Sequence, residues 1–383
     1  MYSWRVRACD RTKRCSPWSR VNYLNLGRLR EDINGDGYGD IMESLSTGVR
    51  PYTGVPQLAD TRLGDAVIDH ESYGSMVVSE GRHVRFVGDL NGDGYADLAR
   101  MLDDDGEDRV LFIYGGADSN VALETVAADG FLVDPVGDEN ADGYADIASV
   151  QFPGSTYTIW HGAETMSDGA SRSVSTGLSA AFDGSRPIHV AAVGDLTADG
   201  IVDSVAAGAA EAVIEAGNSG SSVEWRINNP YQCNIGMRSV GAVGDLDGNG
   251  VADFATACAY TGLAVFLSDP DGFVETEFSW VYPGESQSSL FAGEGADFNG
   301  DGYSELVVHS GAQLWTWQGA LATPVAGGFV NATEVDFRFH FVTDLNGDGD
   351  EDLVTSAGYV IWWHEQYASE YFAFPNLEGS IGY

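Results

Sequence analysis

The sequence has little positive charge and no long apolar run. Lys13 is its single lysine, and 58 acidic residues against 19 basic residues give a net charge of −39 over 383 residues. Such a surface repels nucleic acid and anionic membranes, so we expect neither as a partner. No apolar stretch approaches the roughly 18 residues that span a bilayer, so we expect no membrane insertion.

Sequence motifs for catalysis and for zinc binding are also missing. The seven histidines are scattered, and no HExxH, GxSxG or P-loop pattern occurs, so we expect the chain not to be an enzyme. The four cysteines form no CxxC pair, which argues against a structural zinc site. Two disulfides, Cys9–Cys15 and Cys233–Cys258, would suit an oxidising compartment, and free buried cysteines are the alternative.

The sequence does contain a recurring acidic loop. In VGDLNGDGYAD (87–97), side-chain oxygens occupy the first, third, fifth and ninth positions of a loop that begins at Asp89. Hard cations such as calcium take six to eight oxygen ligands, and this spacing supplies them. The backbone carbonyl of Tyr95, at the seventh position, would add another ligand, and Gly94 permits the sharp turn.

Seven such loops occur, and their first positions are 57, 49, 57, 50, 52 and 47 residues apart. A period near 50 indicates one supersecondary unit that is repeated and packs on its neighbours. The predicted metal ligands, taken loop by loop in the order of positions one, three, five, seven and nine, are Asp32, Asn34, Asp36, Tyr38 and Asp40; Asp89, Asn91, Asp93, Tyr95 and Asp97; Asp138, Asn140, Asp142, Tyr144 and Asp146; Asp195, Thr197, Asp199, Ile201 and Asp203; Asp245, Asp247, Asn249, Val251 and Asp253; Asp297, Asn299, Asp301, Tyr303 and Glu305; and Asp344, Asn346, Asp348, Asp350 and Asp352.

The EF-hand is the main rival interpretation, because its 12-residue calcium loop ends in a bidentate glutamate. The first loop has Glu43 at its twelfth position. The same position in the other loops holds Arg100, Ser149, Ala206, Thr256, Val308 and Thr355. The flanking apolar runs have strand length and no helical spacing. We therefore reject the EF-hand and interpret Glu43 as a coincidence.

The regions around the loops predict short strands. Each loop lies between two short apolar runs, and a third run follows about ten residues later, with room for a fourth strand. Four short strands in each of seven units, with glycine-rich turns, predict an all-β propeller, whose ring protects the strand edges. Five third runs carry an aromatic residue at the same place: Tyr114, Trp160, Phe266, Trp317 and Trp363. Repetition at one structural position favours packing between blades over sugar stacking, although the neighbouring His161, Gln318 and His364 would suit a lectin.

The segments VGDLNGDGYADLARM (87–101) and FVTDLNGDGDEDLVTS (341–356) resemble FG-GAP/VCBS repeats, the units of the seven-bladed propeller at the head of integrin α chains. Similar repeats occur in bacterial surface proteins and some fungal lectins. The resemblance covers residues 21–383. It implies four antiparallel strands per blade, with a calcium loop between the first and second strands. Residues 2–19 resemble, more weakly, the last two strands of a fibronectin type III domain, so residues 1–20 are expected to be a β-hairpin remnant of an upstream domain.

The loops would also form as turns of Asx residues and glycine without metal. Three carboxylates within a few ångströms of one another repel unless a cation compensates them, so the sequence favours up to seven bound ions. Calcium is preferred over magnesium because the ligands are numerous, flexible and exclusively oxygen. The loop at Asp195 offers the hydroxyl of Thr197 where the loop at Asp89 offers the carbonyl of Asn91. We expect the Asp195 loop to bind most weakly.

These observations predict a calcium-stabilised, non-enzymatic binding or adhesion module that is monomeric and belongs to a longer secreted or cell-surface protein. Its ligand would be a protein or a glycan. Met1–Trp4 lacks the order of a signal peptide. A lectin-like propeller is the first alternative, and it needs exposed tryptophan beside polar side chains. A polysaccharide-active enzyme is the second, and it needs acidic and basic residues in one cleft away from the loops.

The sequence also predicts how the ring ends. We expect residues 370–374 to form the outermost strand of the last blade, and we expect no N-terminal strand to close the ring.

Overall fold

The computed structural model describes residues 2–4, 22–24, 31–44, 48–54, 68–69, 84–104, 107–117, 122–127, 132–150, 156–178, 189–197, 199–208, 211–217, 225–228, 237–258, 262–269, 280–282, 290–292, 304, 306–310, 313–317, 326–331, 340–346, 352–355, 359–364, 367–373 and 380–382. The described strands form seven four-stranded antiparallel sheets and one two-stranded sheet. We call the four-stranded sheets blades 1 to 7 and give each from its innermost to its outermost strand.

Blades 1 to 3 are as follows. Blade 1 contains β30 (Ser380–Gly382), β3 (Ile41–Ser44), β4 (Gly48–Tyr52) and β5 (Ile68–Asp69); blade 2 contains β6 (Arg85–Gly88), β7 (Asp97–Asp104), β8 (Glu107–Tyr114) and β9 (Ala122–Ala127); blade 3 contains β10 (Leu132–Gly137), β11 (Asp146–Val150), β12 (Thr156–Trp160) and β13 (Ser171–Ser175).

The remaining blades come from the second half of the chain. Blade 4 contains β14 (His189–Gly194), β15 (Asp203–Ala207), β16 (Glu211–Glu215) and β17 (Trp225–Asn228); blade 5 contains β18 (Met237–Gly244), β19 (Asp253–Cys258), β20 (Gly262–Phe266) and β21 (Trp280–Tyr282); blade 6 contains β22 (Leu290–Ala292), β23 (Leu306–Ser310), β24 (Gln313–Trp317) and β25 (Ala326–Asn331); blade 7 contains β26 (His340–Thr343), β27 (Asp352–Thr355), β28 (Tyr359–His364) and β29 (Tyr367–Ala373).

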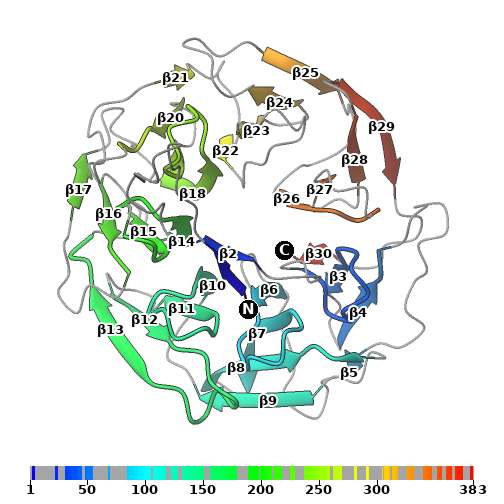
Figure 1. The fold of residues 1–383 in the computed structure, drawn as a ribbon, viewed down its shortest axis with the longest axis vertical. Helices are drawn as coiled ribbons and strands as arrows, with labels where there is room; N and C mark the ends of the chain where they lie inside the picture. Colours follow the sequence, from blue (N-terminus) through cyan, green and yellow to red (C-terminus); the bar gives the residue numbers. More distant parts are fainter. Residues whose placement is uncertain are drawn as a thin grey trace, which may run out of the picture.

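The blades are arranged in a ring, with the first strand of each near the centre and the fourth at the rim (Figure 1). The innermost strands of neighbouring blades contact one another, as β6 does with β10 and β10 with β14. The prediction of an all-β propeller with four antiparallel strands per blade is therefore confirmed.

The C-terminal strand β30 completes blade 1. β30 pairs with β3, so that Met42 faces Gly382 and Ser44 faces Ser380. Blade 7 has four strands without β30. Its outermost strand is β29, which overlaps residues 370–374, the run that the sequence predicts as the outermost strand of this blade. The first blade differs from the sequence prediction, since its innermost strand comes from the C-terminal end of the chain and the loop at Asp32 does not link its first two strands. The last described strand of the chain is thus hydrogen-bonded to the first blade, and the inner edge of β3 is paired.

The N-terminal segment also differs in part from the prediction. β1 (Tyr2–Trp4) pairs with β2 (Asn22–Leu24). A hairpin within residues 2–19 was expected, but the partner strand lies at 22–24, inside the range assigned to the propeller. The residues between the two strands, with Cys9 and Cys15, lie outside the described part of the chain.

The hydrophobic core lies between the blades. One cluster combines Leu90 and Phe112 of blade 2 with Val133 and Ile147 of blade 3, and a second joins blades 4 and 5. Phe254 and Phe266 stack at a ring-centroid distance of 4.6 Å within blade 5. From blade 1 to blade 5, each blade thus buries one face against the next, as the repeat period predicts.

Candidate metal centres

Four of the acidic loops begin directly after a β-bulge. The register of the first strand shifts immediately before the loop, at glycines with positive φ: Gly88 (83°), Gly137 (70°), Gly194 (82°) and Gly244 (69°). A bulge with a left-handed glycine bends its strand and ends regular pairing. The recurring Val-Gly-Asp sequence therefore has a structural reason, because its glycine forms the bulge and its aspartate starts the loop.

In the first five loops, the first aspartate accepts a hydrogen bond from the turn that follows it. In the second loop the N–H of Gly94 donates to Asp89 Oδ2 at 2.7 Å, and the φ of Gly94 is +87°. The same bond recurs from Gly37 to Asp32 (2.9 Å), Gly143 to Asp138 (2.9 Å), Gly200 to Asp195 (2.8 Å) and Gly250 to Asp245 (2.7 Å). A Cβ at Gly94's counterparts Gly37 and Gly143 would meet no atom within 4 Å, so the left-handed backbone, and not space, requires glycine there.

The third and fifth positions form Asx turns at the surface. Asn91 Oδ1 accepts the N–H of Asp93 at 3.0 Å, and Asp93 Oδ1 accepts the N–H of Tyr95 at 2.9 Å. The first and third loops repeat both bonds. The described loops therefore have an internal hydrogen-bonded frame. The side-chain oxygens that receive no hydrogen bond within this frame are the ones available to bind a metal ion.

The ninth aspartate is buried and holds its blade together. Asp97 is 0% exposed; its Oδ2 accepts the N–H of Leu90 at 2.8 Å and its Oδ1 accepts the N–H of Gly115 at 2.8 Å. Leu90 is the second residue of the loop, and Gly115 directly follows the third strand of the blade. The ninth aspartates of the first, third, fourth and fifth loops accept the same pair of bonds, from Ile33 and Gly54, Glu139 and Gly162, Leu196 and Gly217, and Leu246 and Ser268.

From the sequence, we did not predict that the ninth aspartate would also bind the N–H after the third strand. A glycine that recurs just after this strand is the sequence signal that could have indicated it. A Cβ at Gly115 would lie 2.3 Å from the carbonyl oxygen of Ala96 and 2.7 Å from that of Ile33 in the preceding blade. Gly162 is equally enclosed by the carbonyl oxygens of Ala145 and Leu90. The chain passes through a gap that admits no side chain.

Burial makes the ninth carboxylates difficult to ionise in the absence of a cation. Desolvation raises the pKa of Asp97 to about 8, those of Asp146 and Asp253 to about 7, and that of Asp203 to about 6. The backbone N–H groups act in the opposite direction, and neighbouring carboxylates such as Asp93 and Asp89 raise the pKa of Asp97 further. A bound cation would favour the charged form of all these groups.

Two buried oxygens show that the residues fit a cation. Thr197 Oγ1 and Asp89 Oδ1 are buried and have no hydrogen bond of ordinary geometry, although the N–H groups of Gly92 and Asp93 lie close enough to Asp89 to lower its pKa. Both oxygens belong to the predicted ligand sets of their loops. In the fifth loop, Asp245, Asp247 and Asp253 each place a carboxylate oxygen within 4.8 Å of the others. An oxygen-only donor set with unmet buried oxygens is what a hard cation requires.

Glu43 has a different partner. It is buried on β3, where its Oε2 accepts bonds from Arg50 Nη1 and Tyr52 Oη, both at 2.9 Å. The carboxylate therefore belongs to an ion pair within blade 1, in agreement with the rejection of the EF-hand. Arg100, the twelfth residue counted from Asp89, is also buried and donates to the carbonyl of Gly48 at 2.9 Å.

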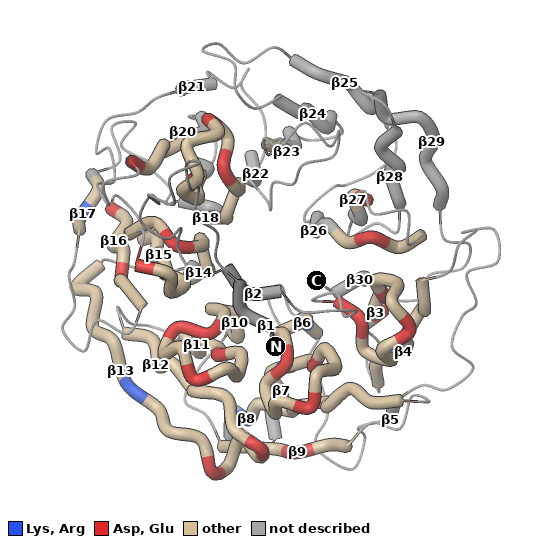
Figure 2. The backbone as a smooth tube through the Cα atoms, in the orientation of Figure 1, with Lys and Arg blue, Asp and Glu red and all other residues tan. Residues whose placement is uncertain are grey.

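Neighbouring loops are joined by backbone hydrogen bonds. The eighth-position N–H of one loop donates to the first-position carbonyl of the preceding loop: Ala96 to Asp32 (3.0 Å), Ala145 to Asp89 (2.9 Å), Ser304 to Asp245 (3.1 Å) and Gly39 to Asp344 (2.7 Å). The last bond crosses the junction between blades 7 and 1. The loops thus lie side by side around the ring, and Figure 2 shows their acidic residues recurring from blade to blade.

Some predicted residues lie outside the described part of the chain: Asp297, Asn299, Asp301, Tyr303, Glu305, Asp348 and Asp350. In the seventh loop, Asp352 Oδ2 accepts the N–H of Leu345 at 3.1 Å, as in the other loops. In the fifth loop, carboxylate oxygens of positions one, three and nine lie within 4.8 Å of one another, whereas in the first four loops the described hydrogen bonds link positions within the turn without such a cluster of three loop carboxylates. The seventh-position residues join each turn through their N–H groups, and their carbonyls as ligands stay a prediction.

Of the third-strand aromatics, those with described side chains pack between blades. Tyr114 and Phe266 are buried, and Trp160 is half-buried against the cluster shared by blades 2 and 3. The indole N–H of Trp160 donates to Ser149 Oγ at 2.9 Å. This agrees with the packing interpretation. The side chains of Trp317 and Trp363 lie outside the described set.

Comparison with known proteins identifies the repeat and the fold. A family model described as an FG-GAP-like repeat matches residues 245–308. An Agrocybe aegerita lectin, solved for its recognition of non-reducing terminal N-acetylglucosamine, has a similar structure, with a TM-score of 0.59 and 16% identity over 87% of this chain and 89% of that chain. BBS1N in complex with ARL6DN is similar with a TM-score of 0.52 and 12% identity, over 84% of this chain and 84% of that chain. Sqt1 of Saccharomyces cerevisiae is similar with a TM-score of 0.53 and 9% identity, over 82% of this chain and 77% of that chain.

At these identities the solved structures show the fold alone. No curated protein sequence matches the chain. Within the described residues, no helix has the length and apolar character needed to cross a membrane. The repeated four-stranded sheets and the solved neighbours agree that the chain is a β-propeller, and residues 245–308 of it match an FG-GAP-like repeat.

Proposed function

We propose that the chain is a calcium-binding, non-enzymatic binding module of a secreted or cell-surface protein, in which the ions stabilise the propeller. The observation that supports this most strongly is the second loop. Its buried Asp89 Oδ1 has no hydrogen bond of ordinary geometry, with only the N–H groups of Gly92 and Asp93 nearby, and burial raises the pKa of Asp97 to about 8. A divalent cation would satisfy both groups at once, because it replaces missing donors and compensates charge.

In this proposal each ion would be held by side-chain oxygens of positions one, three, five and nine, and by the seventh carbonyl. The ion supplies positive charge at the turn between the first and second strands. The frame of N–H bonds orients the first and ninth carboxylates, and the Asx turns orient the third and fifth. The proposed role is structural, because each ion would fix the turn of its loop, and neighbouring loops are joined by backbone hydrogen bonds.

Calcium-dependent unfolding tests this proposal. A ligand that binds only the folded state adds RT ln(1 + [L]/Kd), about 2.7 kcal/mol per site at a hundredfold excess over Kd. Excess EDTA should therefore lower the melting temperature by many degrees, and calcium should restore it at lower concentration than magnesium does. An unfolding curve that does not move with EDTA or calcium would refute the proposal.

The ligand of the module is proposed to be a protein or a glycan. Glycan binding is the second candidate, and it is favoured by the similarity in fold to the lectin that recognises N-acetylglucosamine. Against it, Trp160 is half-buried against the cluster shared by blades 2 and 3 and its indole N–H is bonded to Ser149, so it is less available for sugar stacking than an exposed tryptophan. A glycan array probed with the calcium-loaded protein separates the two, because a lectin gives a defined sugar preference and a protein-binding module gives none.

A further inference from the structure

The third loop is anchored differently from the others. The second residue of a loop donates its N–H to the ninth aspartate, so the anchoring of its side chain fixes that N–H. In the other loops with a described second residue, this residue is apolar and buried: Ile33, Leu90, Leu196, Leu246 and Leu345. In the third loop it is Glu139, a carboxylate that is only 4% exposed.

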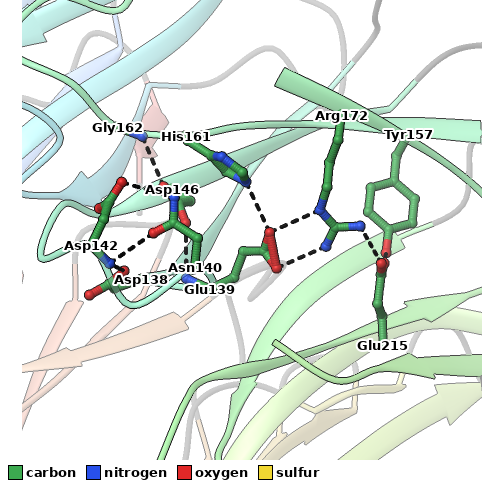
Figure 3. Close-up of polar contacts among 10 residues, drawn as sticks. All are labelled: Asp138, Glu139, Asn140, Asp142, Asp146, Tyr157, His161, Gly162, Arg172 and Glu215. Atoms are coloured by element: carbon green, nitrogen blue, oxygen red, sulfur yellow. Dashed lines mark hydrogen bonds and ion pairs between the residues drawn. The ribbon is translucent and has the colours of Figure 1, made fainter. Parts of the chain in front are cut away.

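Glu139 is held by a cation from the outer strand of its own blade. Arg172, on β13, donates from Nε to Glu139 Oε1 at 3.0 Å and from Nη2 to Oε2 at 2.8 Å, and His161 Nε2 lies 3.0 Å from Oε1 (Figure 3). Burial raises the pKa of Glu139, but the bonds and charge of Arg172 outweigh it, so the pKa is lowered overall. A bidentate guanidinium–carboxylate pair of this kind is both strong and directional.

The same guanidinium reaches the next blade. Arg172 Nη1 is bonded to Glu215 on β16, and Glu215 also accepts a hydrogen bond from the hydroxyl of Tyr157 on β12 (Figure 3). Glu139 and Glu215 are both buried, and their charges meet at one arginine that is partly exposed. The junction between blades 3 and 4 is therefore closed by an ionic network near the loop, in addition to apolar packing.

The network is connected to the candidate metal ligands by one bond. The N–H of Glu139 donates to Asp146 Oδ2 at 2.9 Å, and Glu139 directly follows Asp138, the first position of the loop. Glu139, Asp146 and His161 do place potential ligand atoms within 4.8 Å of one another. They do not form a separate cation site, because Arg172 occupies both oxygens of Glu139 and would repel a second cation.

We propose that Arg172 is a positioning residue for the third metal site: through Glu139 it holds the N–H that orients Asp146, and it thereby replaces the apolar anchor of the other loops. This inference rests on the proposed calcium binding. Partners that orient metal ligands change affinity by about 10- to 100-fold when they are removed. An unpaired buried carboxylate at Glu139 would draw water or a proton into the site and displace the loop.

The test uses a rescue that the other loops suggest. All variants carry Glu215→Gln, so that no unpaired carboxylate remains on blade 4. Arg172→Met should weaken the binding of one calcium ion by about 10- to 100-fold in a chelator-competition titration, with the other ions unaffected. Glu139→Leu added to Arg172→Met restores the leucine anchor of the second loop, and affinity should return to near that of the parent. Arg226→Met is the control and should change no site, because this outer-strand arginine pairs with exposed Glu211 and donates to the carbonyl of Thr176 across the same junction, and both of these residues lie outside the acidic loops.

Two further variants and one further readout make the result decisive. Asp142→Ala should abolish the third site, and adding Arg172→Met to it should cause no additional loss of calcium affinity. In EDTA, hydrogen–deuterium exchange over residues 138–146 should be faster in Arg172→Met and slow again with Glu139→Leu. If the parent binds no calcium, the proposed function fails, while the exchange result still decides whether Arg172 orders the loop. Unchanged calcium affinity with Arg172→Met, or a loss that Glu139→Leu does not reverse, would overturn the inference.

Discussion

The second and fourth loops have the same frame but leave different oxygens unmet. In both, the sixth glycine bonds to the first aspartate and the second residue bonds to the ninth. In the second loop the unmet buried oxygen belongs to the carboxylate of Asp89, whereas in the fourth it is the hydroxyl of Thr197. Both loops have an aspartate at position one, so the difference in affinity is expected at position three, where the second loop offers the amide oxygen of Asn91 and the fourth the weaker hydroxyl of Thr197.

The ninth aspartates differ in the same direction. Asp203 Oδ2 accepts the N–H groups of both Leu196 and Thr197, at 2.8 and 2.9 Å, whereas Asp97 Oδ2 accepts that of Leu90 alone among the described bonds. Burial raises the pKa of Asp97 to about 8 and that of Asp203 to about 6. The fourth loop is stabilised more by its own backbone, and this comparison teaches that charge count alone does not rank these sites.

The largest expected effect comes from deleting a ninth carboxylate. Asp97→Ala leaves the buried N–H groups of Leu90 and Gly115 without acceptors, at a cost of about 1–3 kcal/mol each. Asp203→Ala leaves three N–H groups without an acceptor, those of Leu196, Thr197 and Gly217. In EDTA, denaturant unfolding should therefore show a loss for Asp203→Ala at least as large as that for Asp97→Ala, and calcium should then make Asp97→Ala the more destabilised. Equal losses in calcium would contradict the comparison.

Stability of the calcium-free protein should fall as pH rises. A carboxyl whose folded pKa is raised above its unfolded value binds more protons in the folded state, so its contribution is lost as pH increases. For Asp97 the window runs from about 4 to about 8, and for Asp203 it ends at about 6. In EDTA the melting temperature should be higher at pH 5 than at pH 8. Asp97→Asn should flatten this slope above pH 6, and Asp203→Asn should not.

Substitutions at the third position should reverse the order of calcium affinity of the second and fourth loops. Thr197→Asp supplies a carboxylate in place of a hydroxyl and should tighten the fourth site, by about tenfold for a change of about 1.4 kcal/mol. Asn91→Thr should weaken the second site in the same way. Calcium affinities measured by chelator competition check both, and a fourth site that is indifferent to Thr197→Asp would show that its hydroxyl is not a ligand position.

The smallest effect is expected at the exposed fifth position. Asp93→Ala and Asp199→Ala each remove one Asx-turn bond at the surface, to Tyr95 and Ile201 respectively. Without calcium, both should cost less than about 1 kcal/mol. With calcium, Asp199→Ala should reduce the melting temperature less than Asp93→Ala does, because the fourth site contributes less. The reverse order in thermal unfolding would reverse the proposed ranking.

The spacing of the loops was sufficient to predict the propeller and the tight turns that follow each first aspartate in the described loops, because alternate oxygens before a left-handed glycine make a local turn. The non-local features were not predictable. β30 is three residues long and carries no periodic signal, yet it completes blade 1. The partners of Arg172 lie 33 and 43 residues away in the chain, and only the packing of blades brings Glu139 and Glu215 to it. The second role of Asp97 likewise depends on where the third strand ends.

Counting the ions on the intact chain tests the central claim most directly. Native mass spectrometry in decreasing free calcium should show several bound ions, up to seven, with one lost first. Asp199→Ala should remove that first-released ion and leave the others, whereas Asp93→Ala should remove an ion that is released later. A chain that carries no calcium at millimolar concentration, or one in which Asp199→Ala removes the last ion to leave, would contradict the account.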